Sequence, residues 1–216
     1  MIELDRRRAL VSTAGLAVGG IATARLLPEE MLLRDRRPAR SRVAILSAGY
    51  SEGLGDSLLR ALRLFGLTLR GKSVLIKPNL VEYIAGVEVN TNPMLVGAAA
   101  EAFRNLGARS VVVAEGPGHQ RDTYLVLAES GLEAQLRRWK LAFVDLNRDE
   151  LIKVATRANY TGLDHLWLPR TVLASDFVVS MPKIKTHHWA GVTLSMKNMF
   201  GIVPGTKYGW PKNVLH

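Results

Sequence analysis

Cationic and hydrogen-bonding side chains are concentrated in the segment MPKIKTHHWAGVTLSMKNMFGIVPGTKYGWPKNVLH, from Met181 to His216. The segment contains five lysines, three histidines and no acid. Lysine ammonium groups without neighbouring carboxylates attract anions such as carboxylates and phosphates. The sequence therefore predicts a site for a small anionic ligand. Its expected ligand-binding residues in this segment are Lys183, Lys185, Thr186, Ser195, Lys197 and Asn198.

Polar side chains also follow other apolar runs that have the composition of buried strands. Lys77 and Asn79 come directly after VLI, Glu115 ends the run SVVVAE, and the lysine-rich segment follows DFVVS. In open parallel sheets, ligands bind beyond the carboxyl ends of the strands. We therefore expect Lys77, Asn79 and Glu115 to line the same site as the lysines.

Two side chains of this set are expected to be catalytic. A general acid or base needs a pKa near neutrality, or surroundings that shift its pKa there. Glu115 and His187 are the candidates. Asn92 is also an expected ligand contact. Purely structural roles are the alternatives for three of these features. Lys77 could be a lysine whose stem packs at a strand end, EGPG could be a tight turn, and Asn92 could be a helix cap.

Several kinds of chemistry are excluded or disfavoured. The chain has no cysteine, so it can form no disulfide, thiolate zinc site or protein-ligated iron–sulfur cluster. The motifs GxGxxG and HExxH are absent. The adjacent histidines at 187 and 188 would point to opposite faces of a strand, so no metal site is predicted.

The body of the chain alternates between strand and helix patterns. Apolar runs at 43–46, 74–76, 110–114, 141–146 and 176–180 predict strands, and residues 54–65, 92–106 and 122–129 predict helices. This order predicts an α/β fold with an open, mainly parallel sheet and helices on both faces, incomplete at the carboxyl end. Residues 147–172 form either an insertion or a hairpin around Pro169. We expect TLSMKNMFG to form a short helix capped by Thr193 or Ser195.

The amino-terminal residues have the three parts of an export signal. Three arginines at positions 6–8 precede a mildly apolar run that ends in the small-residue site Ala22-Thr23-Ala24. The run is shorter than the roughly 20 apolar residues of a membrane span. The sequence therefore predicts a twin-arginine-like signal peptide (1–24), a linker (25–41) and a domain (42–216) in an exported, periplasmic protein with no stable span after cleavage. A signal anchor or a disordered basic leader are the alternatives.

The motifs VLIKPNLV, TNP, EGPG, DFVVSMPKIKTH and VTLSMKNMFGIVPGTKYGWPKNVLH together resemble the bacterial and archaeal domain of unknown function numbered 362. The family's recurring positions fall on the residues selected above. Many members carry a twin-arginine leader or occur with ferredoxin-type iron–sulfur modules, which implies a redox partner. The family domain normally continues beyond GWPKNVLH. The resemblance therefore implies a truncated chain, with any iron–sulfur cluster on a missing part or on a partner.

Three functions are consistent with these observations. The favoured one is an enzyme that acts on a small carboxylate or phosphate, with a redox link implied by the family. The alternative is a non-catalytic module that holds an anion or cofactor for an iron–sulfur oxidoreductase. The third is attachment to a membrane surface or nucleic acid through the net charge of +10. Nucleic acid is disfavoured for an exported protein, and no cofactor is assigned.

Overall fold

A computed structural model describes residues 42–118, 120–156, 162–187 and 190–209. The predicted signal peptide and linker lie outside the described residues, as do His119, His188, Trp189 and Trp210. Residues Ala44–His216 form one compact unit. No helix within the described ranges has the length and apolar character required to cross a membrane.

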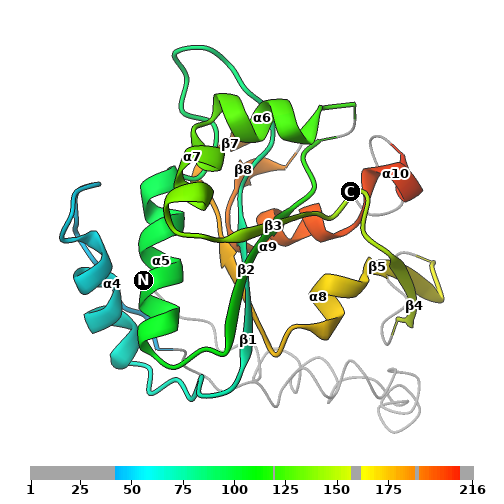
Figure 1. The fold of residues 1–216 in the computed structure, drawn as a ribbon. Coiled ribbons are helices and arrows are strands. Elements are labelled where there is room, and N and C mark those ends of the chain that lie inside the picture. Colours follow the sequence, from blue (N-terminus) through cyan, green and yellow to red (C-terminus); the bar gives the residue numbers. More distant parts are fainter. Residues whose placement is uncertain (1–41, 119, 157–161, 188–189, 210–216) are drawn as a thin grey trace, which may run out of the picture. The chain divides into compact units, whose positions relative to one another are not determined.

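The centre of this unit is a sheet of four parallel strands in the order β3–β2–β1–β6 (Figure 1). Because all neighbouring pairs are parallel, the four carboxyl ends lie at one edge of the sheet. This arrangement confirms the predicted α/β fold and four of the five predicted strands. The strands are β1 (Ser73–Pro78), β2 (Ser110–Glu115), β3 (Ala142–Asp145) and β6 (Phe177–Met181).

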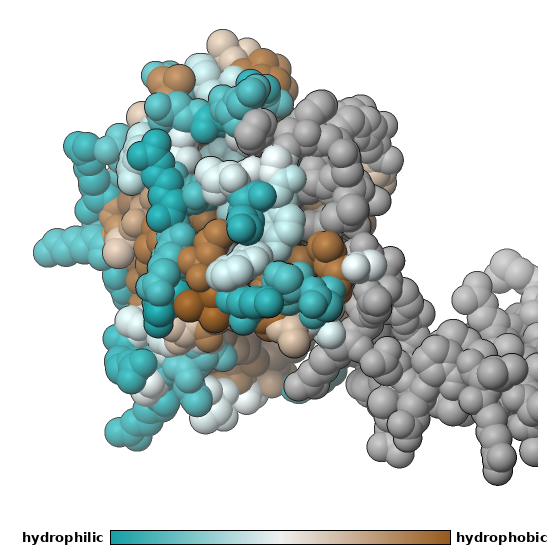
Figure 2. All heavy atoms as spheres, turned by 90° about the vertical axis from the view of Figure 1, so that its right-hand side faces the viewer, coloured by the Kyte–Doolittle hydropathy of each residue, from teal (hydrophilic) through white to brown (hydrophobic). Residues whose placement is uncertain are grey.

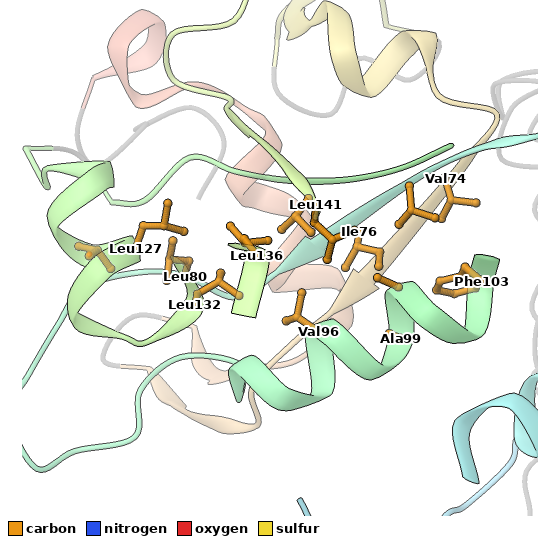
Figure 3. Close-up of a cluster of buried hydrophobic side chains, with 14 of the residues drawn as sticks. Val74, Ile76, Leu80, Val96, Ala99, Phe103, Leu127, Leu132, Leu136 and Leu141 are labelled. Carbon is orange, nitrogen blue, oxygen red and sulfur yellow. The ribbon is translucent and has the colours of Figure 1, made fainter. Parts of the chain in front are cut away.

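Helices cover both faces of the sheet (Figure 1). Alternate side chains of a strand point to opposite faces, so Val74 and Ile76 pack into one core cluster and Leu75 into another. Figure 3 shows Val96 and Phe103 of α5 among the side chains of the first cluster. On this face lie α4 (Leu54–Arg63), α5 (Pro93–Asn105), α6 (Thr123–Glu129) and α7 (Leu132–Arg138). The second cluster involves α8 (Arg170–Ala174) and the 3₁₀ helix η2 (Phe200–Ile202), which follows α9 (Ser195–Met199).

Helix α5 begins and ends where the sequence predicts. Asn92 Oδ1 accepts a hydrogen bond from Met94 N at 2.9 Å, and Pro93 occupies the first helical position. Gly107 follows the helix with a φ of 90°, a left-handed conformation that favours glycine. The cap role of Asn92 is thereby confirmed, and its predicted ligand contact remains a prediction.

Residues 147–172 contain a hairpin of two antiparallel strands, β4 (Leu151–Ala155) and β5 (His165–Pro169). Pro169 pairs with Leu151 at the open end of this hairpin, so the predicted turn around Pro169 is wrong. A second hairpin, β7 (Lys185–His187) and β8 (Gly191–Thr193), precedes α9, and α10 spans Gly205–Tyr208. Figure 2 shows mostly hydrophilic side chains on the coloured part of the face that carries α10 and the first hairpin.

The strand predicted at residues 43–46 is not formed. Val43 and Ile45 are 79% and 97% exposed, and the segment has no regular secondary structure. Both positions beside β1 are taken by β2 and β6, which come later in the chain. A short apolar run specifies a preference for burial but no pairing partner, and here the later strands occupy the central positions.

Asp176, directly before β6, is hydrogen-bonded to Ser73 at the start of β1. Its Oδ2 accepts hydrogen bonds from Ser73 N at 2.9 Å and Ser73 Oγ at 2.8 Å. These bonds, with a smaller contribution from Lys72, lower the pKa of Asp176 from 3.8 to about 2. The carboxylate therefore contributes stability above the unfolded-state pKa, and this contribution is lost as the pH falls toward 2.

We expect Asp176→Asn to lower the free energy of unfolding at neutral pH, because the amide replaces an ionised acceptor. The difference between wild type and variant should shrink as the pH falls below 4 toward 2. Urea unfolding at pH 7 and near pH 3 measures this change. A difference that stays constant over this pH range would contradict the assigned role.

Candidate functional site

Lys77 is the centre of the site, and its side chain is fully buried at the carboxyl end of β1. Its Nζ donates to Glu115 Oε2 at 2.5 Å, to Asn198 Oδ1 at 3.2 Å and to the Pro78 carbonyl at 3.2 Å. An ammonium group has three hydrogens to donate, so this set uses its full capacity. Lys77 is therefore a buried, fully bonded cation. The alternative of a lysine whose stem packs at the strand end while its ammonium group stays in solvent is wrong.

Glu115 balances this charge at the end of β2 and is 2% exposed. Its Oε2 also accepts from Leu80 N at 3.2 Å, and its Oε1 accepts from Gly116 N at 2.9 Å. Both carboxylate oxygens are thus occupied as acceptors. In this arrangement Glu115 holds Lys77 and the loops after β1 and β2 in place, and its acid–base role remains a prediction.

Asn198 connects the ion pair to β6, the strand beside β1. This side chain of α9 is 2% exposed and donates from Nδ2 to the Lys77 carbonyl at 3.2 Å and to Ser180 Oγ at 3.0 Å. Its Oδ1 accepts from Lys77 Nζ and from Asn79 Nδ2, each at 3.2 Å. A single amide therefore joins β1, β6 and α9, as expected for a residue that fixes the geometry of a site.

Asn79 lies beside Asn198 and has one unused acceptor. Its backbone N donates to Thr91 Oγ1 at 2.8 Å, and Thr91 Oγ1 donates to the Met181 carbonyl at 2.6 Å. Thr91, which the sequence did not predict as a site residue, thus connects Asn79 to the end of β6. Asn79 Oδ1 is buried without a hydrogen-bond partner among the described residues. Such atoms are rare in folded proteins and cost free energy.

Two of the predicted ligand lysines are bonded to the loop between β1 and α5. Lys183 Nζ lies 3.2 Å from Glu88 Oε2, and Lys185 Nζ donates to the Val89 carbonyl at 2.6 Å. Burial is the main cause that lowers the pKa of Lys185, and the charge of Lys197 lowers it further. Lys185 is the first residue of β7, whereas Lys183 lies in the loop between β6 and β7.

Lys197 has a different environment from these two lysines. Its Nζ lies 4.8 Å from the centroid of the Phe200 ring and forms no ion pair with a carboxylate of the described residues. Burial lowers the pKa of Lys197, and the positive charge of Lys77 lowers it further. Lys197 is therefore a half-buried cation next to a second cation, which leaves local positive potential uncompensated.

The remaining predicted residues lie around this cluster. Thr186 is exposed in β7, and Ser195 is exposed at the first position of α9. The N-cap of α9 is Leu194 without a side-chain cap bond, so the predicted cap at Thr193 or Ser195 is wrong. Thr193 is instead buried in β8. His187 Nδ1 accepts a hydrogen bond from Ala190 N at 3.2 Å.

Gly201 is a further residue on which the site depends. A Cβ atom at this position would lie 2.7 Å from Glu115 Oε1 and 2.8 Å from Lys77 Nζ, closer than real Cβ atoms come to other atoms. No side chain therefore fits here while the ion pair is in place. The described residues contain no group of three or more histidine or acidic side chains that could hold a metal ion.

We expect Gly201→Ala to destabilise the protein by about 1–3 kcal/mol, the usual cost of overpacking a buried position. Gly49→Ala is the matched control, since a Cβ there meets no atom within 4 Å. Urea unfolding of both variants measures the difference. Equal stability of the two variants would show that the buried pair can move aside.

Comparisons with known proteins agree with the family resemblance. Residues 74–216 match the family described as "Domain of unknown function (DUF362)". The "Thylakoid-associated protein sll1697" of Synechocystis sp. is 29% identical over 143 residues. This match covers 65% of the chain and 42% of that protein, so the chain spans less than half of the relative's length. No solved structure matches the chain significantly.

The family match includes Lys77, Glu115, Asn198 and Gly201, which form the buried centre of the site. It also covers well over half of the chain. This chain belongs to the DUF362 family.

Proposed function

We propose that this protein is an enzyme that binds a small anionic substrate, a carboxylate or phosphate, at the carboxyl edge of its sheet. The observation that carries the proposal is the state of Lys197. This half-buried ammonium lies near the buried Lys77 and has no carboxylate partner among the described residues. Electrostatic attraction is stronger in a partly buried site than in water. An anion bound there would supply the missing negative charge.

The neighbouring residues divide into a hydrogen-bonded floor and two cations above it. Lys77, Glu115 and Asn198 use their hydrogen-bonding groups on one another and on the backbone, so they form the floor. Lys197 supplies the uncompensated charge, and Lys185 adds a second cation at the rim. Residues held by such a network keep a binding geometry without reorganisation when the ligand arrives.

His187 is the proposed acid–base residue of this enzyme. Its Nδ1 accepts a hydrogen bond from the backbone, so the proton of the neutral ring lies on Nε2. A histidine can donate or accept a proton near neutral pH. Glu115 is retained as a catalytic candidate only if substrate binding releases one of its oxygens.

A non-catalytic binding module is the second candidate function, and one observation favours it. Both oxygens of Glu115 are occupied, so the buried acid beside the lysines is not open to a substrate proton. Such a module would hold its anion, or a cofactor, for a partner oxidoreductase. Binding of an anion without turnover of any carboxylate or phosphate ester would favour this function over an enzyme.

We also propose that the protein acts outside the cytoplasm. The three arginines at 6–8 followed by a mildly apolar run support this location. The relative from Synechocystis is named for its association with thylakoids, a membrane system, which gives independent support. Fractionation of cells that express the full chain, with and without Arg6→Lys and Arg7→Lys, tests the proposal.

We expect Lys197→Met to weaken binding of inorganic phosphate or acetate by about tenfold or more, the usual effect of losing one charge-assisted hydrogen bond. Methionine keeps the length and apolar stem of lysine, so the melting temperature should change little. Lys153→Met, on the exposed side of β4, is the control. Isothermal titration of both variants measures the effect. Equal weakening in both would reduce the proposal to general charge attraction.

The affinity for the anion should also fall as the pH rises. An ammonium group binds anions only below its pKa, and the pKa of Lys197 lies below the usual 10.5. The loss should therefore begin at a lower pH than for an ordinary lysine. Lys197→Arg should reduce this loss, because a guanidinium group stays charged up to about pH 12. Titrations between neutral pH and about pH 10 measure both curves, and identical curves would exclude Lys197 as the titrating group.

A further inference from the structure

A hollow of about 250 Å³ lies at the carboxyl ends of β2 and β3, one strand away from the lysine site. Its walls come from Gly118 and residues 120–123, from Asp145, Asn147 and Arg148, and from the start of α10 at Gly205 and Thr206. Asp145, at its base, pairs in register with Glu115, so the hollow adjoins the ion pair across one strand spacing. Ligands of open parallel sheets bind at this edge.

Asn147 holds the three walls together. Its Nδ2 donates to the Pro117 carbonyl at 3.0 Å, and its Oδ1 accepts from Gly205 N at 3.1 Å. Thr206 Oγ1 donates to the Asn147 carbonyl at 2.9 Å. A Cβ on Gly116 would lie 3.1 Å from this amide, so the approach is close. The hollow is thus formed without a ligand, which lowers the ordering cost of binding.

The acidic side chains that line the hollow are bonded to the protein backbone. Asp122 Oδ1 accepts from Tyr124 N and Leu125 N, each at 2.9 Å. Asp145 is 7% exposed, and its Oδ1 accepts from Asn147 N at 2.9 Å. These carboxylates stabilise the start of α6 and the turn after β3.

Donor groups, in contrast, remain available. Arg148 Nε lies 3.8 Å from Asp145 Oδ2, beyond hydrogen-bond distance, and its side chain is 78% exposed. Arg121 uses one terminal nitrogen for Glu82 at 2.7 Å, while a guanidinium group has five N–H donors. Thr123 is 6% exposed and lines the hollow.

From these contacts we infer that the hollow is a second binding site, which takes the phosphate or carboxylate group of a small molecule. Arg148 and Arg121 bind its oxygens through their unused N–H groups, and the Thr123 hydroxyl adds a neutral hydrogen bond. Guanidinium groups suit such ligands because two parallel N–H donors match two oxygens. The volume is below the roughly 300–1,000 Å³ of sites for drug-sized ligands, so the site fits a small molecule or one group of a larger one.

This site is independent of the proposed enzyme function, because none of its described lining residues is a lysine of the first site. The test uses phenylglyoxal, which modifies accessible arginines, on the full chain, with mass spectrometry of each arginine-containing peptide. Phosphate, acetate and chloride are compared at equal ionic strength, since salt alone screens exposed charges. Arg137, whose side chain is 79% exposed in α7, is the internal control.

We expect phosphate or acetate to slow modification of Arg148 and Arg121, with chloride and Arg137 showing no such effect. Protection by phosphate alone assigns a phosphate group, and protection by acetate alone assigns a carboxylate. Thr123→Val should raise the protecting concentration several-fold, while Lys197→Met should leave it unchanged. Absence of protection by both anions, or equal protection of Arg137, would overturn the proposal. Loss of protection in Lys197→Met would assign the effect to the lysine site instead.

Discussion

The buried ion pair between Lys77 and Glu115 is the interaction on which the rest of the site depends. Transfer of one charged group from water to the protein interior costs several kcal/mol after relaxation. The pair offsets this cost only if each remaining donor and acceptor finds a partner. The backbone N–H groups of Leu80 and Gly116 and the amide of Asn198 meet this demand. Three separate segments, the residues at the ends of β1 and β2 and the helix α9, are thereby fixed around one pair of charges.

The same requirement explains why the polar residues occur as short motifs at strand ends. Lys77 must end β1 so that its Nζ reaches Glu115 at the end of β2, the adjacent strand. Position 201 must be a glycine, because any side chain there would occupy the volume of the ion pair. Asn198 must lie one helical turn before it, within reach of the Lys77 carbonyl. The motifs KPN, EG and KNMFG are therefore consequences of one buried contact.

The sequence was sufficient to predict the sheet and the residues near its carboxyl edge. Buried strands have strong apolar runs, and the cap Asn92 with Pro93 is a local signal. The partners of the lysines could not be predicted, because they come from distant parts of the chain. Lys183, in a segment without acids, pairs with Glu88, which is 95 residues away.

Uncharged residues that join distant segments by hydrogen bonds were also difficult to predict. Asn147 and Thr91 join loops by hydrogen bonds between segments that the sequence does not show as neighbours. Val43 and its apolar neighbours show the converse error, since apolar composition predicted a buried strand. Composition indicates that a segment prefers to be buried, whereas topology decides which strands pair with β1.

Glu115 and Asp145 occupy paired positions on β2 and β3, and their partners differ. Glu115 lies 2.5 Å from the fully buried ammonium group of Lys77, so the two charges neutralise each other inside the fold. Asp145 satisfies its Oδ1 with the backbone and has Arg148 at 3.8 Å, largely in solvent. A close, buried pair fixes structure, whereas a loose pair at the surface contributes little stability. The guanidinium of Arg148 therefore costs the fold little if it turns to the ligand proposed for the hollow. The edge of this sheet would then separate a structural charge from a binding charge within one strand spacing.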